Sequence, residues 1–423
     1  MKFNTLCVLG LGYIGLPTAS TFATQGLKVV GVDVNQAVVD RLKNGDVHIL
    51  EPGLRTLVQA AIGSGNLEIK AEPVEADAFI IAVPTPFYED KRADMRYVRT
   101  ATEMILPYLR KGNLVVLEST SPPRTIVDLV APILEQSGMK AGEDFYLVYS
   151  PERVLPGQIL RELIENARVI GGVNRASAEA GRDLYSLFVR GEIYLTDATT
   201  AEMVKLMENT TRDISIAIAN EFSRLADFFN IDVFEAIALA NKHPRINILN
   251  PGVGVGGHCI GVDPWFLVEA APHLTPLIRT ARMVNDSQPA FILSLVQRAL
   301  HQDIEHKRIA ALGLTYKADV DDIRESPAIH VVQLLAEAGA AVRAYEPLKP
   351  DIQINGVEIC KTLGSALADA DLILVLVGHR QFINLSPNDV AVMTSSRLVI
   401  DIPGVWQSAE WNKFGFTIHR LRV

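Results

Sequence analysis

The residues with the clearest potential for chemistry lie in one glycine-rich segment, residues 252–263. It carries Cys259 among several glycines, and Asp263 follows four residues later. Glycine permits positive φ and a close approach of backbone to a ligand, and a cysteine thiolate is a competent nucleophile. Two interpretations stay open at this point: a reactive cysteine presented to a ligand, or a tight turn that contains a small apolar cysteine.

Three polar residues share one face of a predicted long helix. Lys205, Asn209 and Arg212 stand at i, i+4 and i+7, the spacing of residues on a common helix face. The positions around them are apolar, and no carboxylate stands four residues after Lys205 to pair with it. A lysine in apolar surroundings loses basicity, which suits a proton donor or acceptor. A solvated stripe of charge is the alternative.

Other charged residues could take part in binding. Glu152, at the end of a predicted strand, is a candidate base or only a partner for Arg153. Arg245 could bind a phosphate through two hydrogen bonds, or lie on the surface. Lys317 and Arg324 stand among acidic residues and could simply pair with them.

The beginning of the chain matches the dinucleotide-binding fingerprint in its expected context. An apolar strand leads into Gly-x-Gly-x-x-Gly at residues 10–15, followed by a predicted helix over 16–25 and a strand over 28–32 that ends at Asp33. The glycines admit a pyrophosphate to the helix N-terminus. Asp33 can accept hydrogen bonds from a ribose 2′-OH and would repel a 2′-phosphate, so the pattern predicts NAD rather than NADP. Three glycines and the single charge of Lys2 argue against a secretory leader.

The rest of the first half alternates strands with helices, as a parallel doubly wound sheet does. Hydroxyl residues follow the predicted strands 78–83 and 114–117, at the edge where such sheets bind ligands. A further strand is predicted over 146–149.

The middle of the chain is predicted to be helical. Thr199-x-x-Glu202 has the pattern of a capping box and would start one long helix that ends near residue 230. More helix is expected from residue 232, and another helix from Pro289 to about residue 303.

The last third repeats the strand pattern of the first. Segments 308–313, 341–347, 371–377 and 397–401 correspond to its four first strands, but the glycine fingerprint does not return after Gly313. The predicted fold class is therefore α/β, with two Rossmann-like doubly wound domains joined by a central all-helical domain. The expected domains are 1–198 for NAD, 199–303 for dimerisation and 304–423 for a second nucleotide.

Composition narrows the function classes. The 423 residues have a net charge of −9, which argues against a nucleic-acid partner. No uncharged apolar run reaches the ~18 residues of a membrane helix. Three scattered cysteines are too few for a disulfide framework or a zinc site, so no metal is expected and a reduced, cytoplasmic setting is expected by default.

A nicotinamide fold, a reactive cysteine and a second nucleotide fold together suggest oxidation beyond an aldehyde. A thiolate can add to an aldehyde to give a thiohemiacetal, hydride loss then gives a thioester, and water releases an acid.

Four motifs make the chain resemble the UDP-glucose/GDP-mannose dehydrogenase family over nearly its whole length. They are Gly-Leu-Gly-Tyr-Ile-Gly-Leu-Pro at 10–17, Ser-Pro-Glu-Arg-Val-Leu-Pro-Gly at 150–157, Gly-Val-Gly-Gly-His-Cys-Ile-Gly-Val-Asp-Pro-Trp-Phe at 254–266 and Asp-Ile-Arg-Glu-Ser-Pro at 322–327. The resemblance implies a four-electron, NAD-dependent oxidation at C6 of a UDP-2-acetamido sugar, UDP-N-acetyl-D-mannosamine, to the uronic acid used in surface polysaccharides. It also implies a homodimer or larger homo-oligomer through the long helix.

The resemblance assigns roles to matching residues. It implies Cys259 as the thioester nucleophile, Lys205 with Asn209 as proton donor and oxyanion partner, Asp263 as the residue that orients the lysine or the water, and Glu152 as a candidate base. The residues implied to line the sugar-nucleotide site are Arg153, Val154, Lys205, Asn209, Arg212, His243, Arg245, Gly256, Tyr316 and Lys317. The residues implied to hold NAD are Gly10, Gly12, Tyr13, Ile14, Gly15, Asp33, Thr85, Thr120 and Arg324. His243 and Arg245 are expected to reach a neighbouring subunit's site.

One position departs from the family pattern. Pro403 stands where the resemblance implies a lysine at the substrate, and proline has no side-chain donor. UDP-N-acetylglucosamine and UDP-glucose therefore stay open as substrates. A two-electron hydroxyacid dehydrogenase would not need Cys259, and a non-enzymatic NAD-sensing protein would not need a polar row on the helix.

Overall fold

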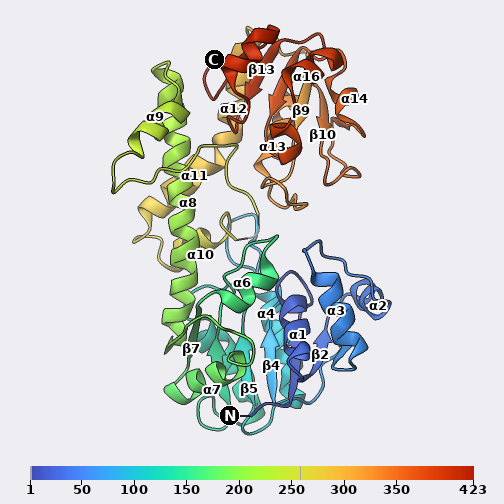
Figure 1. Cartoon of the computed structure of the whole chain (residues 1–423). Helices are drawn as coiled ribbons and strands as arrows, with labels where there is room; N and C mark the ends of the chain where they lie inside the picture. Colours follow the sequence, from blue (N-terminus) through green and yellow to red (C-terminus); the bar gives the residue numbers. More distant parts are fainter. Residues whose placement is uncertain (1, 258) are drawn as a thin grey trace. The chain divides into compact units, whose positions relative to one another are not determined.

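The computed structural model describes residues 2–257 and 259–423, which form two compact units (Figure 1). Unit 1 comprises Met1–Glu208 and Trp265–Pro272, and unit 2 comprises Asn209–Pro264 and His273–Val423. Each unit has its own sheet, in which most strands are parallel, and its own core. Two helices, α8 (Ala198–Phe228) and α10 (Asp263–Ala270), contribute residues to both units.

Unit 1 is built on a sheet in the order β3-β2-β1-β4-β5-β6-β7-β8. Its first six strands are parallel, while β7 pairs with β6 in the antiparallel sense. The strands are β1 (Thr5–Leu9), β2 (Lys28–Val32), β3 (Leu67–Lys70), β4 (Ala78–Ile81), β5 (Leu114–Leu117), β6 (Tyr146–Tyr149), β7 (Arg168–Gly172) and β8 (Ile193–Asp197). The helices are α1 (Gly15–Thr24), α2 (Gln36–Lys43), α3 (Leu54–Gly63), α4 (Arg96–Ile105), α5 (Ala131–Leu134), α6 (Ile159–Glu165) and α7 (Arg175–Tyr185).

Both faces of this sheet are buried, as continuous apolar strands require. Along β1, Leu6 and Val8 pack with α1, α2, α3, α6 and α7, whereas Cys7 and Leu9 pack with α4, α5 and the start of α8. Alternation of side chains across the pleat therefore divides one strand between two cores.

Unit 2 contains a fully parallel sheet in the order β11-β10-β9-β12-β13-β14. Counted from its own first strand, this is the order 3-2-1-4-5-6, which the first six strands of unit 1 also show. The strands are β9 (Arg308–Leu312), β10 (Ala341–Tyr345), β11 (Val357–Ile359), β12 (Leu372–Val375), β13 (Leu398–Asp401) and β14 (Thr417–His419). The helices are α9 (Val233–Ala240), α11 (Pro276–Asp286), α12 (Gln288–Ala299), α13 (Pro327–Glu337), α14 (Leu363–Leu367), α15 (Arg380–Ile383), α16 (Pro387–Met393) and α17 (Ser408–Trp411).

The structure confirms the predicted fold class and most predicted elements, with three corrections. The predicted capping box is wrong: Asp197 accepts the Thr200 N–H at 2.9 Å, while Glu202 accepts hydrogen bonds from the backbone of residues 124 and 126. The helix expected to reach residue 303 ends at Ala299, because His301 and Gln302 have positive φ. The third correction is the antiparallel β6–β7 pair within a sheet expected to be wholly parallel.

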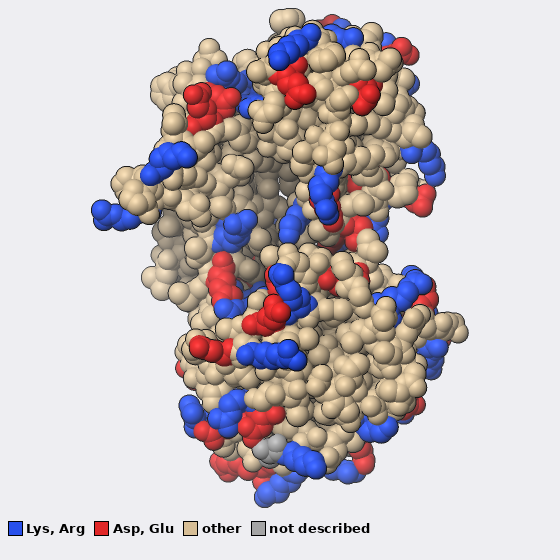
Figure 2. All heavy atoms as spheres, in the orientation of Figure 1, with Lys and Arg blue, Asp and Glu red and all other residues tan. Residues whose placement is uncertain are grey.

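Charge is not concentrated on the face shown in Figure 2, where Lys and Arg side chains lie among Asp and Glu side chains. Among the described residues, no helix is both long and apolar enough to cross a membrane. No cluster of metal-binding side chains occurs in the part of the chain that the structure describes.

Candidate active site

The β1–α1 turn in unit 1 fits the pyrophosphate of a dinucleotide. Gly10 has φ +93°, and a Cβ at Gly10 would lie 2.5 Å from the Ala82 carbonyl oxygen. A Cβ at Gly15 would lie 1.8 Å from the Gly10 carbonyl oxygen, whereas a Cβ at Gly12 would meet nothing within 4 Å. The outer glycines are thus required by the turn itself. The middle one leaves the open space that a close approach of a phosphate needs.

Asp33 follows β2 and braces the same turn. Its Oδ2 accepts the Leu11 N–H at 3.0 Å and its Oδ1 accepts the Asn35 N–H at 2.9 Å, while the side chain stays half-buried. Thr85 and Thr120 are half-buried residues beyond the carboxyl ends of β4 and β5. These positions fit an NAD site at the switch point of the sheet.

Lys205 is anchored inside unit 1. Its Nζ donates a 2.8 Å hydrogen bond to the main-chain carbonyl of Glu152, and the residue is 8% exposed. This burial excludes the alternative of a solvated charge stripe at Lys205. Farther along α8, Asn209 is half-buried and Arg212 is exposed.

The structure also separates the two interpretations of Glu152. The guanidinium of Arg153 pairs with Glu208 at 2.9 Å and donates to the Ala167 carbonyl at 3.0 Å. The Glu152 carboxylate accepts the Arg153 backbone N–H at 2.8 Å and pairs with the buried Arg168. Glu152 is therefore not the ion-pair partner of the Arg153 side chain.

Arg168 belongs to a buried charged cluster that the sequence analysis missed. Its guanidinium contacts Ser150 Oγ at 3.0 Å and Glu118 Oε1 at 3.4 Å, and lies 4.1 Å from the centre of the Tyr185 ring. Burial, only partly offset by Arg168, raises the pKa of Glu118 to about 7. The available signal was a charged residue at each end of otherwise apolar strands, Glu118 after β5 and Arg168 at the start of β7.

In unit 2, Cys259 lies in the glycine-rich loop, before α10 begins at Asp263. Cys259 is exposed, whereas Cys7 and Cys360 are buried. Burial raises the pKa of Cys7 to about 11 and also raises that of Cys360. Because a thiol must ionise to react, Cys259 is the best placed nucleophile of the three.

Asp263 and Asn209 meet beside this cysteine. The backbone N–H groups of Val262 and Asp263 donate to the Cys259 carbonyl at 3.0 and 2.9 Å. The buried Asp263 carboxylate accepts a hydrogen bond from Asn209 Nδ2 at 2.5 Å. The structure thus brings together Asn209, Cys259 and Asp263 within unit 2.

The glycines of this loop are explained by packing against the protein. A Cβ at Gly256 would lie 2.3 Å from the Glu325 carbonyl oxygen, and one at Gly257 would lie 2.9 Å from the Tyr316 ring. The Gly257 N–H donates to the Arg324 carbonyl at 3.0 Å. The loop is therefore braced by the turn after β9 and by the segment before α13.

The base of the loop is held by side chains of two helices. Asn220 of α8 accepts the Gly252 N–H at 3.0 Å, and Gln288 of α12 donates to the Gly252 carbonyl at 3.2 Å. Both amide residues are buried, and neither stood out in the sequence.

The remaining predicted residues are less closely assembled. The guanidinium of Arg324 donates two hydrogen bonds to the Asp322 carboxylate, at 2.6 and 2.8 Å. Arg324 belongs to unit 2, and its contact with NAD stays a prediction. His243 and Arg245 are exposed in the segment after α9. The other predicted residues are Tyr13, Ile14, Val154, Tyr316 and Pro403, which are half-buried, and Lys317, which is exposed.

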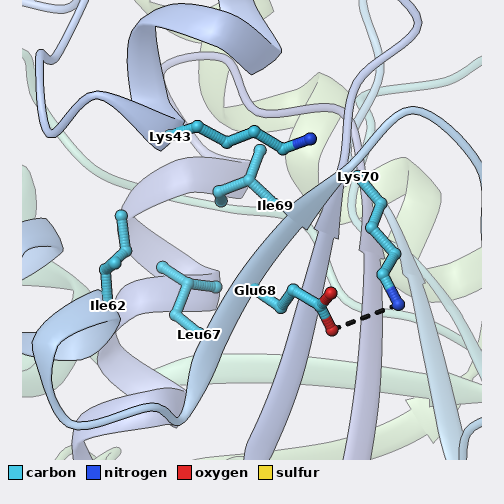
Figure 3. A pocket seen from close by; sticks show the side chains of 6 residues that line it. All are labelled: Lys43, Ile62, Leu67, Glu68, Ile69 and Lys70. Carbon is cyan, nitrogen blue, oxygen red and sulfur yellow. Dashed lines mark ion pairs between the residues drawn. The ribbon is translucent and has the colours of Figure 1, made fainter.

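A hollow at the outer edge of β3 lies apart from these residues (Figure 3). It is lined by Lys43, Ile62 and residues 67–70, and Lys70 pairs there with Glu68 at 3.1 Å. None of the predicted catalytic, cofactor or substrate residues lines it, so it has no part in the proposed reaction.

Three models of one protein family match successive parts of the chain. Residues 4–189, 199–287 and 310–408 match the NAD binding, central and UDP binding domains of the UDP-glucose/GDP-mannose dehydrogenase family. The chain is 46% identical to the UDP-N-acetyl-D-mannosamine dehydrogenase of Methanocaldococcus jannaschii, over 98% of this chain and 96% of that protein. It is 47% identical to an NDP-N-acetyl-D-galactosaminuronic acid dehydrogenase of Ralstonia solanacearum, over 96% and 97% of the two chains.

Solved structures agree with this similarity. The UDP-D-ManNAc dehydrogenase of Pyrococcus horikoshii superposes with a TM-score of 0.91 at 38% identity, covering 99% of both chains. A UDP-N-acetyl-mannosamine dehydrogenase structure from Staphylococcus aureus has a TM-score of 0.90 at 44% identity, covering 99% of this chain and 98% of that one. A non-enzymatic role and a two-electron hydroxyacid dehydrogenase are thereby set aside. The chain belongs to the UDP-glucose/GDP-mannose dehydrogenase family and is an NAD-dependent UDP-sugar dehydrogenase.

Proposed function

We propose that the chain oxidises the C6 alcohol of UDP-N-acetyl-D-mannosamine to UDP-N-acetyl-D-mannosaminuronic acid. The relatives with this name, at 46% identity over nearly the whole chain, support the choice of sugar. The observation that carries the chemistry is the exposure of Cys259 beside the Asn209–Asp263 hydrogen bond. Such a product would enter surface polysaccharides.

The proposed reaction removes four electrons in two steps. NAD, when bound, accepts a hydride in each step. Lys205 first takes the proton of the C6 hydroxyl as the aldehyde forms. The Cys259 thiolate then adds to the aldehyde carbon, and loss of a second hydride from the thiohemiacetal gives a thioester. Water attacks the thioester carbonyl, the carboxylate forms, and the thiolate leaves.

Fixed charges and donors assist each step. The ammonium of Lys205 and the amide of Asn209 would stabilise the oxyanions, an effect whose loss typically costs ~10²–10³ in rate. Asp263 would orient the lysine or the hydrolytic water. Glu152 would act as the base for the water. Both oxygens of the Glu152 carboxylate already accept a hydrogen bond. A carboxylate has about four lone-pair positions, so one remains to accept the proton of the water.

For the binding residues we propose the roles that the family resemblance implies. NAD would be held by the β1–α1 turn, Asp33, Thr85, Thr120 and Arg324. The UDP-sugar would contact Arg153, Val154, Arg212, Gly256, Tyr316 and Lys317, with His243 and Arg245 reaching a neighbouring subunit. We also propose domain boundaries at 198/199 and 303/304.

A homodimer is proposed through the second half of α8 and the residues after it. Phe222, Leu225, Phe228 and Phe229 are 40%, 46%, 81% and 65% exposed. Contiguous exposed apolar side chains of this kind mark association surfaces. Sedimentation velocity of the wild type and of Phe228→Asp tests this: a monomeric wild type would rule it out.

A second candidate substrate has its own support. The 47% identity to an NDP-N-acetyl-D-galactosaminuronic acid dehydrogenase favours a C2-acetamido sugar of another configuration. UDP-N-acetylglucosamine and UDP-glucose are also retained, because Pro403 stands where the family resemblance implies a lysine.

A panel of UDP-sugars tests the proposal. We expect UDP-N-acetyl-D-mannosamine to have the highest kcat/KM and to yield two NADH per sugar without free aldehyde, since specificity is a ratio of these constants. Cys259→Ala should form no uronic acid yet bind NAD normally, and mass spectrometry should detect an acyl adduct on wild-type Cys259. One NADH per sugar, or full activity of Cys259→Ala, would refute the thioester route.

A further inference from the structure

The buried cluster around Arg168 has no role in the reaction as proposed so far. Arg168 is 4% exposed and lies between the carboxylates of Glu118 and Glu152, which follow β5 and β6 in the chain. Tyr185, at the end of α7, donates to Glu118 Oε1 at 2.5 Å and lies under the guanidinium. All of these groups belong to unit 1.

Stability alone is a weak reason for such a cluster. A buried ion pair must offset the cost of removing its charges from water, and replacing it with apolar side chains is often neutral or stabilising. Here Glu118 Oε2 is buried and has no hydrogen-bond partner among the described residues, which adds to that cost. A positional role would account for the cluster.

The contacts of one peptide group indicate what is positioned. The peptide between Glu152 and Arg153 donates its N–H to Glu152 Oε1 at 2.8 Å and accepts the Lys205 ammonium at its carbonyl oxygen at 2.8 Å. Because a peptide group is planar, its N–H and C=O cannot turn independently. The orientation of the Glu152 carboxylate therefore sets the direction of the carbonyl that holds Lys205.

Arg168 holds the other oxygen of that carboxylate. Its contacts with Ser150 and Glu118 fix the guanidinium from a second side, and its planar fork leaves little freedom of rotation. We infer that Arg168 is a positioning residue for Lys205, acting through the Glu152 carboxylate and the Glu152–Arg153 peptide. This inference rests on the proposed catalytic role of Lys205.

Arg168→Lys is the primary test, because it keeps the positive charge but loses the fork. Arg168→Met removes both. The matched control is Tyr185→Phe, which deletes the hydroxyl on Glu118 and leaves the Arg168–Glu152 contact in place. Thermal unfolding and the Kd for NAD identify folded variants, and the reaction is followed with UDP-N-acetyl-D-mannosamine.

We expect kcat to fall at least about tenfold in Arg168→Lys and further in Arg168→Met, where the loss should approach the ~10²–10³ typical of a lost oxyanion partner. KM for the UDP-sugar should change less than about threefold, since the group acts in the transition state. Tyr185→Phe should stay within about twofold of wild type. A general loss of structure would instead lower NAD affinity and raise KM together with the loss of kcat.

A second measurement does not depend on turnover. Brief acetylation with acetic anhydride, read by peptide mass spectrometry, should label Lys205 several times faster in both Arg168 variants than in wild type, and at the wild-type rate in Tyr185→Phe. If Arg168→Met does not fold, Arg168→Lys decides through the same two measurements. Unchanged labelling and unchanged kcat in a folded Arg168 variant would overturn the inference. If the wild type oxidises no UDP-sugar, the proposed function fails, while the labelling still tests the positioning of Lys205.

Discussion

The β1–α1 turn of unit 1 and the β9–α13 turn of unit 2 follow the first strand of each sheet, and the first six strands of the two sheets have the same order. Both begin with a glycine of positive φ, Gly10 at +93° and Gly313 at +88°. In unit 1, Asp33 lies just beyond β2 and accepts the N–H of Leu11, the residue after the glycine. In unit 2, Glu346 lies just beyond β10 and accepts the N–H of Leu314 in the same way.

The two acids nevertheless differ in availability. Asp33 is half-buried, whereas Glu346 is fully buried and accepts the N–H groups of Leu314 and Thr315 at 2.7 and 3.2 Å and a hydrogen bond from His379 Nε2 at 3.2 Å. His379 Nδ1 accepts the Asp319 N–H at 2.9 Å, which assigns the ring proton to Nε2. At the position that we propose for ribose binding in the first turn, the second turn therefore has a carboxylate whose hydrogen bonds lie within the protein.

Substitution of Gly15 should have the largest effect on the first turn. In Gly15→Ala, a Cβ 1.8 Å from the Gly10 carbonyl oxygen would force the turn open. We expect a loss of about 3 kcal/mol or more in the free energy of unfolding and a large loss of NAD affinity. Urea denaturation and calorimetric titration with NAD provide the measurements.

Gly12→Ala is the control within the same turn. Its Cβ would meet nothing within 4 Å, so the fold should be unchanged and only NAD binding weakened. Equal unfolding free energies for the two variants would contradict the division of roles among the glycines.

Removal of His379 should destabilise the second turn. His379→Leu keeps most of the volume but leaves Glu346 buried without its ring partner, at a cost on the order of 3 kcal/mol. UDP affinity should fall because the same ring holds Asp319 in the loop that carries Lys317. His330→Leu, an exposed histidine of α13, should change the unfolding free energy by less than about 0.5 kcal/mol.

The pH dependence of stability should have opposite signs for two buried glutamates. Burial raises the pKa of Glu202 in unit 1 from 4.5 to about 7, so it costs stability as pH rises between these values. Burial alone would raise the pKa of Glu346, but hydrogen bonds from His379 and the Leu314 N–H outweigh it and lower that pKa. Its contribution is therefore present above pH 4.5 and is lost as pH falls below it.

Chemical denaturation of the wild type, Glu202→Gln and Glu346→Gln at pH 4, 5.5 and 7.5 separates the two contributions. Relative to wild type, Glu202→Gln should gain stability on going from pH 5.5 to 7.5. Glu346→Gln should be most destabilised at neutral pH, and less so in acid. The same trend in both variants would show that the two carboxylates are held alike.

Cofactor choice should show the smallest effect. Asp33→Asn combined with Val34→Arg, at a 75% exposed position, should weaken NAD and improve NADP by roughly tenfold each, about 1.4 kcal/mol. Glu346→Gln should leave the NAD/NADP ratio of kcat/KM unchanged. A wild type that already prefers NADP would refute the role of Asp33.

The features predicted correctly from sequence are those whose cause is local. The glycine turn at 10–15, the strand that ends just before Asp33 and the long helix that the structure places at Ala198–Phe228 follow from steric limits, side-chain alternation and helical spacing within a few residues. The strand pattern repeated in the last third of the chain is also local, and it correctly predicted a second nucleotide-binding type of fold.

The features that only the tertiary structure decided depend on partners far apart in the chain. Glu202 has the spacing of a capping box, but it bonds backbone 76 and 78 residues away. Arg168 meets Glu118 across 50 residues, and His379 meets Glu346 across 33. A buried charge must find a partner wherever the fold brings one. Residue types alone could therefore suggest Lys205 and Cys259 as candidate reactive residues. The cluster that we propose to orient Lys205, and the hydrogen bonds between His379 and Glu346 in the second turn, depend on how the fold places the strands side by side.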